Sequence, residues 1–366
     1  MKVLWFNLQV DRERQGLAFA IDWLNTVAKH VTRIDVITMK AGEYQVDDNV
    51  HIYSVGKEKG YSEARRTIEF YRILWKLVSQ HDYDACFAHM MPLFVVMAAP
   101  VLRFKNLPVV LWYTHKSVTF ILRFATFCAA RVVTASSESF RIKSPKVRII
   151  GHGIDTDRFV PKKKAHDPNR PFTLLSVGRL SRIKRIEYLI EAVKVFHQQH
   201  REQPLRLRIV GGPLTKPDQL YAVELRELVQ QLQLEEIVTF VGRVPFQDVV
   251  SCYQDADCFV SLSATGSIDK AVLEAMSCGV PVIVPSAYSS VLGPQLAKCW
   301  VIEADVGQLS QRIESMIALG GTERERLGRQ LREIVIRDHT LPKLCARILA
   351  QLKRVAYTEK SASFKI

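Results

Sequence analysis

The sequence predicts an α/β protein of two Rossmann-like domains, each built on a parallel sheet, with a ligand cleft between them. Apolar runs of strand length alternate with amphipathic segments of helix length, the pattern of βαβ units with helices on both faces of a sheet. The 366 residues also exceed the ~250–300 at which a single hydrophobic core stops growing. In such open sheets ligands bind outside the carboxyl ends of the strands, so we expect a site in the cleft.

The first domain is expected over residues 1–165. Short apolar runs predict its strands, and longer segments in which apolar residues recur every three or four positions predict its helices. The strands are expected at 2–8, 34–38, 50–54, 84–88, 108–113, 131–134 and near 147–150. The helices are expected at 14–28, 62–79, 92–102 and 117–129.

The second domain is expected over residues 166–340. Its boundary with the first domain lies within the segment VPKKKAHDPNRP at 160–171, which is charged, contains prolines and lacks an apolar period, and therefore predicts a linker. The strands are expected at 172–177, 205–211, 237–241, 257–262 and 281–284. The helices are expected at 184–200, 217–233, 246–255, 269–277, 306–318 and 322–336, with a last helix at 341–356.

Composition and charge narrow the class of protein. Apolar residues make up 48% and charged residues 24%, which excludes a disordered chain. No run reaches the ~18 apolar residues of a membrane helix, and the N-terminal segment lacks a signal-peptide cleavage site, so we expect a cytoplasmic protein. The seven cysteines form no C-x-x-C pair, which favours reduced thiols over disulfides or zinc. A net charge of +14 favours an anionic partner: nucleic acid, acidic lipid or a phosphorylated small molecule.

The loop after the first strand of the second domain is the main candidate for a phosphate site. No G-x-G-x-x-G or Walker sequence occurs, which argues against nicotinamide redox chemistry and P-loop phosphoryl transfer. Instead, LLSVGRLSRIKRIEYLIEAV places Arg179 and Lys184 between a strand and the start of a helix. The helix dipole, a guanidinium able to bind bidentately and an ammonium group together suit a diphosphate. The alternative is a solvated, basic start of a helix.

Further motifs give the second domain a specific family resemblance. GRVP at 242–245, DADCFVS and LEAMSCGVPVI, together with Arg179 and Lys184, resemble the donor domain of the family-4 retaining glycosyltransferases over residues 172–285. GHGID followed by Phe159, and the segment DHTLPKLCARILAQL, are similar to the family's segment before the linker and to its closing helix. The resemblance implies a GT-B fold, a nucleotide-sugar co-substrate, no metal or other cofactor, and a C-terminal helix 341–366 that packs back on the first domain.

The resemblance also implies roles for individual residues. Arg179 and Lys184 would neutralise the leaving diphosphate in place of a metal, which is electrostatic catalysis. Glu274 matches the second acid of the family's E-x7-E motif and would bind the ribose hydroxyls, whereas by itself it would be interpreted as a helix-surface carboxylate. Backbone groups near Arg243 and Val244 are expected to contact the base.

The sequence departs from the family where the motif would have its first acid. Gly266 stands eight residues before Glu274, so the residue that would contact the transferred sugar is missing. Asp269 is the nearest carboxylate and either replaces that acid or is an acid at the start of a helix. Lys270 is a candidate for the anionic part of the donor. The identity of the sugar therefore stays open.

The first domain offers fewer candidates. Gly16 opens the helix after the first strand, where family members bring donor and acceptor together, although Gln15 replaces their preceding glycine. By the resemblance, His115 would lie near the anomeric centre and hydrogen-bond the donor sugar or the leaving phosphate oxygen; a histidine satisfied within its loop is the alternative. His89 is a weaker second candidate.

Two helices of the first domain bear on the acceptor and on membranes. The helix at 62–79 carries a basic stripe, which suits either an acidic membrane surface or an ordinary solvated helix. Residues 117–129 are apolar on almost every side, which predicts either burial or contact with a bilayer or a lipid-linked acceptor. A peripheral position at the inner face of the membrane is therefore one expectation.

Together these patterns predict a hexosyltransferase-type glycosyltransferase that transfers a sugar from a nucleotide-diphosphate sugar to a lipid-linked or envelope-glycan acceptor, with retention and without a metal. A sugar-nucleotide epimerase of the same fold is one alternative. A non-catalytic basic protein that binds membranes or nucleic acid is another. Because no nucleic-acid-binding motif accompanies the charge, nucleic acid is not expected as a partner.

Overall fold

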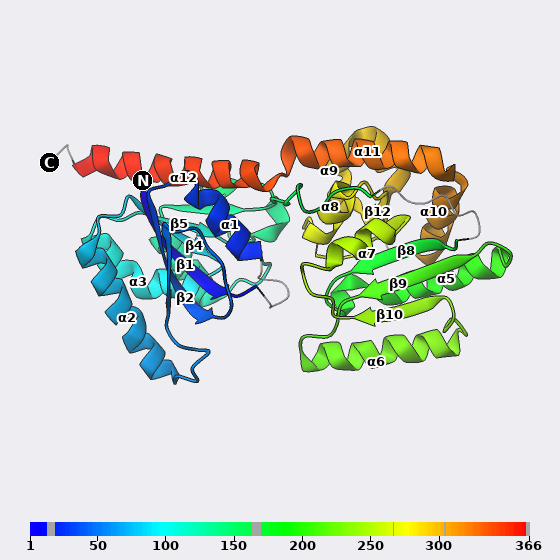
Figure 1. Cartoon of the computed structure of the whole chain (residues 1–366), viewed down its shortest axis with the longest axis horizontal. Helices are drawn as coiled ribbons and strands as arrows, with labels where there is room; N and C mark the ends of the chain where they lie inside the picture. The colour runs from blue at the N-terminus through cyan, green and yellow to red at the C-terminus, as the bar shows by residue number, and fades with distance from the viewer. Residues whose placement is uncertain (13–18, 163–169, 266, 304, 364–366) are drawn as a thin grey trace. The chain divides into compact units, whose positions relative to one another are not determined.

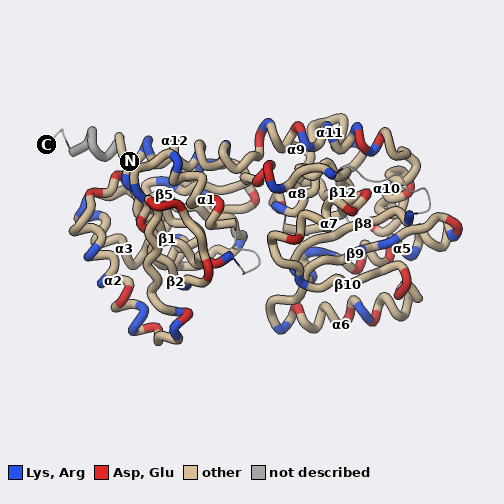
Figure 2. The backbone as a smooth tube through the Cα atoms, in the orientation of Figure 1, with Lys and Arg blue, Asp and Glu red and all other residues tan. Residues whose placement is uncertain are grey.

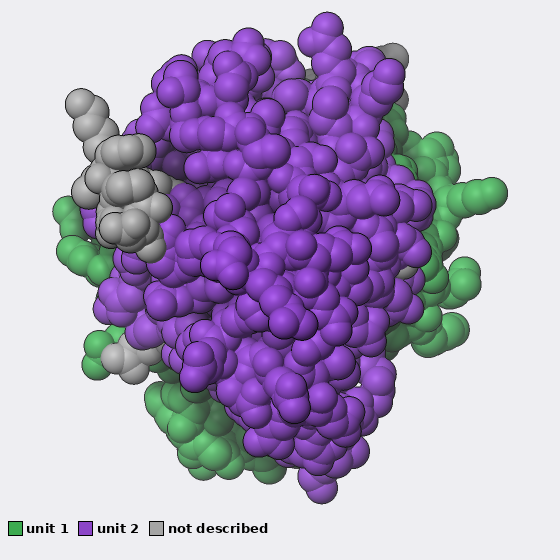
Figure 3. All heavy atoms as spheres, turned by 90° about the vertical axis from the view of Figure 1, so that its right-hand side faces the viewer, with its two compact units in different colours: residues 1–153, 341–366 green, residues 154–340 purple. Residues whose placement is uncertain are grey.

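The computed structural model describes residues 1–12, 19–162, 170–265, 267–303 and 305–363, without the side chains beyond residue 357. The chain forms two compact units (Figure 3), each with its own sheet (Figure 1). Unit 1 consists of Met1–Gly153 together with Leu341–Ile366, and unit 2 of Ile154–Thr340.

The boundary between the units therefore lies ahead of the expected linker. Residues 154–162, which we expected in the first domain, belong to unit 2 because contacts within that unit hold them. Ile154 forms a β-bridge with Thr340, and the Arg332 guanidinium donates hydrogen bonds to the carbonyl oxygens of Phe159 (2.8 Å) and Thr156 (3.2 Å).

Unit 1 contains a seven-stranded parallel sheet in the order β3-β2-β1-β4-β5-β6-β7. β1 lies inside the sheet between β2 and β4, and its apolar run at residues 3–6 is buried, as expected for a strand covered on both faces. The chain changes direction along the sheet between β1 and β4, as in doubly wound folds. The strands are β1 (Lys2–Val10), β2 (Arg33–Ala41), β3 (Val50–Ser54), β4 (Ala85–His89), β5 (Val109–Trp112), β6 (Arg131–Thr134) and β7 (Val147–Ile149).

Helices cover both faces of this sheet. One hydrophobic cluster joins it to α2, α3 and α4, and another joins its other face to α1 and the C-terminal helix α12 (Figure 1). Ser62 caps α2 by accepting a hydrogen bond from the amide of Arg65, and Thr119 caps α4 through the amide of Leu122. The helices are α1 (Phe19–Ala28), α2 (Glu63–Gln80), α3 (Pro92–Phe104), α4 (Phe120–Cys128), η1 (Ser137–Ser139) and α12 (Leu341–Ser363).

Unit 2 repeats the doubly wound pattern with a six-stranded parallel sheet in the order β10-β9-β8-β11-β12-β13. The strands are β8 (Phe172–Val177), β9 (Leu205–Val210), β10 (Val238–Gly242), β11 (Cys258–Val260), β12 (Val282–Pro285) and β13 (Val301–Ile302). The helices are η2 (Arg182–Lys184), α5 (Ile186–Gln199), α6 (Lys216–Gln231), α7 (Val249–Asp255), α8 (Lys270–Ser277), η3 (Ser286–Tyr288), α9 (Ser289–Trp300), α10 (Val306–Ala318) and α11 (Gly320–Asp338). The predicted fold of two Rossmann-like α/β domains is confirmed.

Three local features differ from the expectations. α9 was not expected, because Gly293 and Pro294 interrupt the helical pattern there, and β13 was not expected, because it is only two residues long. On α2 the sequence predicts an apolar stripe of Ile68, Tyr71, Trp75 and Val78. Ile68 and Trp75 are exposed, and of this stripe only Val78 belongs to the buried face of the helix. α4 is shorter than expected and buries only one side. In the described part of the chain no helix has the length and apolar character that crossing a bilayer requires.

Candidate functional site

Two glycine-containing loops meet at the carboxyl edge of the unit 2 sheet. Gly178 follows β8 with a φ of 154°, and Gly211 follows β9 with a φ of 129°. A Cβ atom on Gly211 would lie 1.9 Å from the carbonyl oxygen of Gly178, so the close approach of the loops requires glycine at position 211. The amide of Leu180 donates to the carbonyl oxygen of Gly212 (3.2 Å) and ties the loops together.

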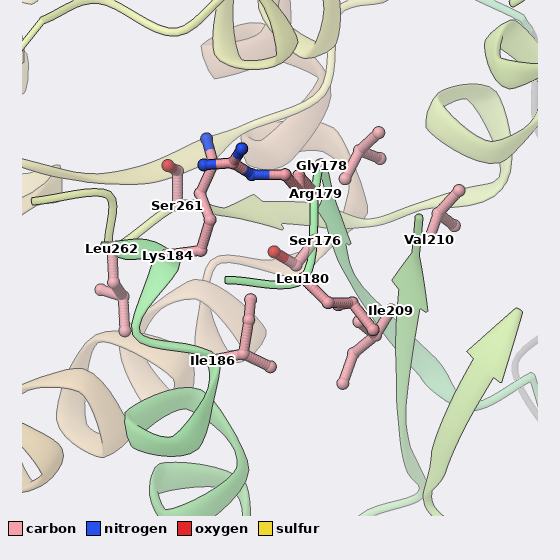
Figure 4. A pocket seen from close by; sticks show the side chains of 11 residues that line it. Ser176, Gly178, Arg179, Leu180, Lys184, Ile186, Ile209, Val210, Ser261 and Leu262 are labelled. Carbon is pink, nitrogen blue, oxygen red and sulfur yellow. The ribbon is translucent and has the colours of Figure 1, made fainter. Parts of the chain in front are cut away.

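The loop after β8 presents two cations to one small cavity. Figure 4 shows Arg179 and Lys184 along this cavity, with Ser176 and Ser261 among its polar groups. Its apolar lining includes Leu180, Ile186, Ile209, Val210 and Leu262. The structure therefore brings together the two residues that the sequence suggested for a diphosphate.

Arg179 is oriented by a carboxylate on α6. Its side chain is 47% exposed, and its Nε lies 3.8 Å from Asp218 Oδ2. Asp218 is buried at the start of α6, where it accepts hydrogen bonds from the amides of Leu214 (3.1 Å) and Thr215 (2.9 Å). Burial alone would raise the pKa of Asp218, but these bonds and the nearby guanidinium outweigh it and hold the pKa below its ordinary value. Asp218 therefore stays ionised beside Arg179.

Lys184 is paired with Asp269. Its Nζ lies 2.6 Å from Asp269 Oδ2, and the two side chains are 20% and 19% exposed. Asp269 stands at the N-cap of α8, yet its side chain makes no capping hydrogen bond there. The backbone amide of Asp269 donates to the Tyr288 hydroxyl (2.5 Å), which helps to hold this loop in place. Asp269 is thus neither a simple helix-capping acid nor a free carboxylate; it is the counter-ion of Lys184.

Glu274, on α8, is partly buried and accepts a hydrogen bond from the Tyr253 hydroxyl (2.7 Å). Tyr253, on α7, is fully buried. Burial raises the pKa of Glu274, and the tyrosine bond and the positive charges of Lys270 and Arg158 partly oppose this effect. The carboxylate is therefore held in one orientation, unlike the freely solvated carboxylate of the alternative interpretation.

The segment expected at the base lies after β10. Arg243 is exposed, and its guanidinium donates a hydrogen bond to the carbonyl oxygen of Pro213. A Cβ atom on Gly212 would lie 3.0 Å from the Arg243 side chain, so Arg243 lies against the loop that follows β9. Val244 is partly buried and packs on the core of unit 2. Gly266 lies outside the described residues.

In unit 1, His115 is exposed in the loop after β5. Its Nδ1 accepts a hydrogen bond from the amide of Ser117 (3.1 Å), so the neutral ring carries its proton on Nε2, which is available as a donor. His89 is buried at the end of β4, with its Nδ1 3.0 Å from Asn7 Oδ1, and belongs to the interior of the unit. Gly16 lies outside the described residues.

Sequence reasoning missed three residues that orient this site: Asp218, Tyr253 and Tyr288. The sequence could have indicated Asp218, because Thr215 and Asp218 have the spacing of a capping box at the start of a helix. No sequence pattern marked the two tyrosines, because their contacts with Glu274 and with the amide of Asp269 join different elements, 21 and 19 residues apart. Among the described residues, no group of three or more His, Cys, Asp and Glu side chains is arranged to hold a metal ion.

The comparisons with known proteins agree with this geometry. Residues 157–334 match the family of glycosyl transferases group 1. The chain is 32% identical over 205 residues to the putative colanic acid biosynthesis glycosyltransferase WcaL of Escherichia coli K12, covering 53% of this chain and 47% of WcaL. The chain thus spans less than half the length of that relative.

Solved structures match along nearly the whole chain. Anabaena HepE in complex with UDP and glucose has a TM-score of 0.73 and 18% identity, with 96% of this chain and 99% of HepE covered. Sucrose-phosphate synthase from Thermosynechococcus elongatus has a TM-score of 0.78 and 17% identity, with 98% and 99% covered. The chain therefore has the GT-B fold, and its residues 157–334 match glycosyl transferases group 1.

Proposed function

We propose that this protein is a hexosyltransferase-type glycosyltransferase that transfers a sugar from a nucleotide-diphosphate sugar to an acceptor. The observation that carries the proposal is the convergence of Arg179 and Lys184 on one cavity at the carboxyl edge of the unit 2 sheet. The segment that holds them lies within the match to glycosyl transferases group 1. HepE, of the same fold, has been solved with UDP and glucose, which supports a nucleotide-sugar donor.

In the proposed reaction the two cations neutralise the diphosphate as it leaves. Negative charge grows on the phosphate oxygen when the bond to the sugar breaks, and preorganised cations stabilise that charge without a metal. Arg179 suits two phosphate oxygens because its guanidinium is planar, whereas Lys184 acts as a point charge. To bind the donor, Lys184 must share or exchange its contact with Asp269.

The other site residues receive roles around this diphosphate. We assign the ribose hydroxyls to Glu274 and the base to the segment of Arg243 and Val244. The loop of Gly266, Asp269 and Lys270 is assigned to the sugar side of the donor. His115 of unit 1 is assigned to the donor sugar or the leaving phosphate through its Nε2. Retention of anomeric configuration and membership of the family-4 enzymes are parts of the same proposal.

The acceptor is proposed to be a lipid-linked or envelope glycan. Support comes from WcaL, which is named as a colanic acid biosynthesis glycosyltransferase. A cytoplasmic position at the inner membrane face, with acidic lipid as a partner, would bring such an acceptor to the enzyme. The epimerase alternative is not favoured, because the matched family and relative are named as glycosyltransferases.

A panel of nucleotide sugars tests the proposal. We expect hydrolysis or transfer with at least one donor in EDTA, and a loss of turnover of at least ~10²-fold in Arg179→Ala and in Lys184→Ala, as for removal of one charge-stabilising donor. Arg182→Ala is the matched control, because Arg182 belongs to the same loop but pairs with Glu224 (2.6 Å). Near-normal turnover in both cavity variants, or activity only with added Mn²⁺, would contradict the mechanism.

A further inference from the structure

Helix α4 exposes an unusual amount of aromatic surface. Only Leu122, Ala125 and Thr126 are buried on it. Phe120 is 84% exposed and Phe127 75%, and Phe124 and Ile121 are exposed as well. The rings of Phe124 and Phe127 stack with centroids 6.2 Å apart. The apolar sequence of this helix therefore does not reflect burial in the core of unit 1.

The neighbouring helix α3 extends this surface. Phe104, the last residue of α3, is 76% exposed. α3 and α4 pack against each other on the same face of the sheet and follow parallel strands in the same way, so their C-terminal ends lie at the same edge. We name Phe104, Phe120, Ile121, Phe124 and Phe127 the aromatic face. Large exposed apolar surfaces of this kind mark sites of interaction.

The chain around the aromatic face is basic. Residues 85–137, which include α3 and α4, contain no aspartate or glutamate. Their basic residues are Arg103, Lys105, Lys116, Arg123 and Arg131. Arg131 is not part of this surface, because its side chain hydrogen-bonds Gln351 of α12 (2.9 Å) on the opposite face of the sheet. Lys146 adds another charge, and its ammonium donates to the carbonyl oxygens of Phe127 (2.7 Å) and Ala129 (2.8 Å) at the end of α4. A partner of this face must therefore accept aromatic rings and carry negative charge.

The basic helix α2 is less suited to the same task. Arg72 of α2 pairs with Glu69 (2.7 Å), and Arg66 lies 3.6 Å from Glu63, so acidic neighbours offset part of its charge (Figure 2). α3 and α4 carry no acidic residue. The strongest combination of exposed aromatic rings and uncompensated charge thus lies on α3 and α4 rather than on the helix that the sequence had suggested.

We propose that the aromatic face docks unit 1 on an anionic lipid bilayer. Phenylalanine side chains enter the boundary between headgroups and acyl chains, while basic residues contact acidic headgroups; two such signals give stable but reversible anchoring. A second copy of the chain is a poorer occupant, because a symmetric contact would bring the same basic surface against itself. The proposal gives the membrane partner of the proposed function a defined surface, but it does not depend on sugar transfer.

Co-sedimentation with lipid vesicles tests this proposal. Vesicles of phosphatidylcholine with about a third phosphatidylglycerol should bind the full chain at low salt, and pure phosphatidylcholine should not. Phe104→Ser combined with Phe127→Ser should weaken binding at least ~10-fold, since two exposed rings are removed from the interface. Leu220→Ser with Val223→Ser is the matched control, because these exposed apolar residues lie on α6 of unit 2. The control variant should bind like the original protein.

Three outcomes would overturn the proposal. Protein that stays in the supernatant at low salt has no bilayer contact. Equal loss of binding in the Phe104/Phe127 and control variants would mean that the aromatic face is not the contact. Self-association that disappears in the Phe104/Phe127 variant, without vesicle binding, would assign the face to a second copy. Hydrolysis of the nucleotide sugar by the same variant shows that it is folded and keeps a failure of docking separate from a failure of the proposed function.

Discussion

The ion pair between Lys184 and Asp269 predicts that a carboxylate limits nucleotide affinity in this protein. The Lys184 ammonium lies 2.6 Å from Asp269 Oδ2 and lines the cavity beside Arg179. In the proposed function a diphosphate oxygen contacts that same ammonium. The phosphate and the Asp269 carboxylate, both negative, then lie next to one cation and repel each other. Asp269→Asn keeps the shape of the side chain and removes its charge. We predict that this variant binds the nucleotide diphosphate more tightly.

Coulomb's law gives the size of the effect. A phosphate oxygen in contact with Lys184 would lie about 3 Å from its Nζ, and therefore ~5 Å from the Asp269 carboxylate. Two unit charges at ~5 Å repel by about 0.8 kcal/mol in water and about 3 kcal/mol at an effective dielectric constant of ~20. Both side chains are about one-fifth exposed, so we expect an intermediate value of about 1–2 kcal/mol. This corresponds to ~5–30-fold tighter binding, and added salt should reduce the gain.

Calorimetric titration measures this difference directly, with whichever of UDP and GDP binds the original protein. Glu235→Gln is the matched control for charge, because Glu235 is exposed just before β10 and thus lies at the opposite edge of the sheet. The control should leave the affinity unchanged. If Asp269→Asn left nucleotide affinity unchanged or weakened it, competition would be refuted. Weaker binding of the full donor, with nucleotide affinity unchanged, would mean that Asp269 contacts the sugar, as its assignment to the sugar side of the donor implies, but does not compete for Lys184.

Three further predictions concern the supports of the site. Tyr253→Phe should weaken nucleotide binding by about 1 kcal/mol, because Glu274 loses the hydrogen bond that orients it; titration checks this. Asp218→Asn should lower the free energy of unfolding by about 1 kcal/mol at neutral pH. The folded pKa of Asp218 is below its unfolded value, so this stabilisation is present above the unfolded pKa and is lost as pH falls through the folded pKa. Denaturant titrations should therefore show a difference in the free energy of unfolding between the variant and the original protein near neutrality, and a smaller difference in acid. Gly211→Ala should lower Tm and abolish nucleotide binding, because its Cβ would collide with the carbonyl oxygen of Gly178.

Much of the fold could be predicted because a short stretch of sequence is enough to mark each strand. The run at 172–177 is bounded by a linker and a glycine, and it forms β8 with the expected limits. The two cations of the basic loop that follows, Arg179 and Lys184, are also close in sequence, and they line one cavity. By contrast, α9 was missed because a glycine next to a proline normally predicts a turn. In the structure, Gly293 adopts a φ of 75° within this helical segment.

Contacts between elements could not be predicted from the sequence. Asp218 reaches Arg179 from a helix 39 residues further along the chain, and Asp269 reaches Lys184 from 85 residues away. No periodicity in the sequence specifies such pairs. The exposure of α4 is a related case, because a helix that is apolar on all sides carries no pattern to show which side faces the core. These details decide how the site binds charge, and they required the structure.

In the proposed function, unit 2 binds a nucleotide diphosphate through Arg179 and Lys184 without a metal. Calorimetric titration of UDP and GDP into the protein in EDTA, with Lys184→Ala measured alongside, measures this binding. We expect one of the two nucleotides to bind in EDTA and Lys184→Ala to weaken this binding at least ~10-fold, because a charge-assisted contact is lost. Binding of neither nucleotide in EDTA, or an affinity that Lys184→Ala leaves unchanged, would contradict the proposed function.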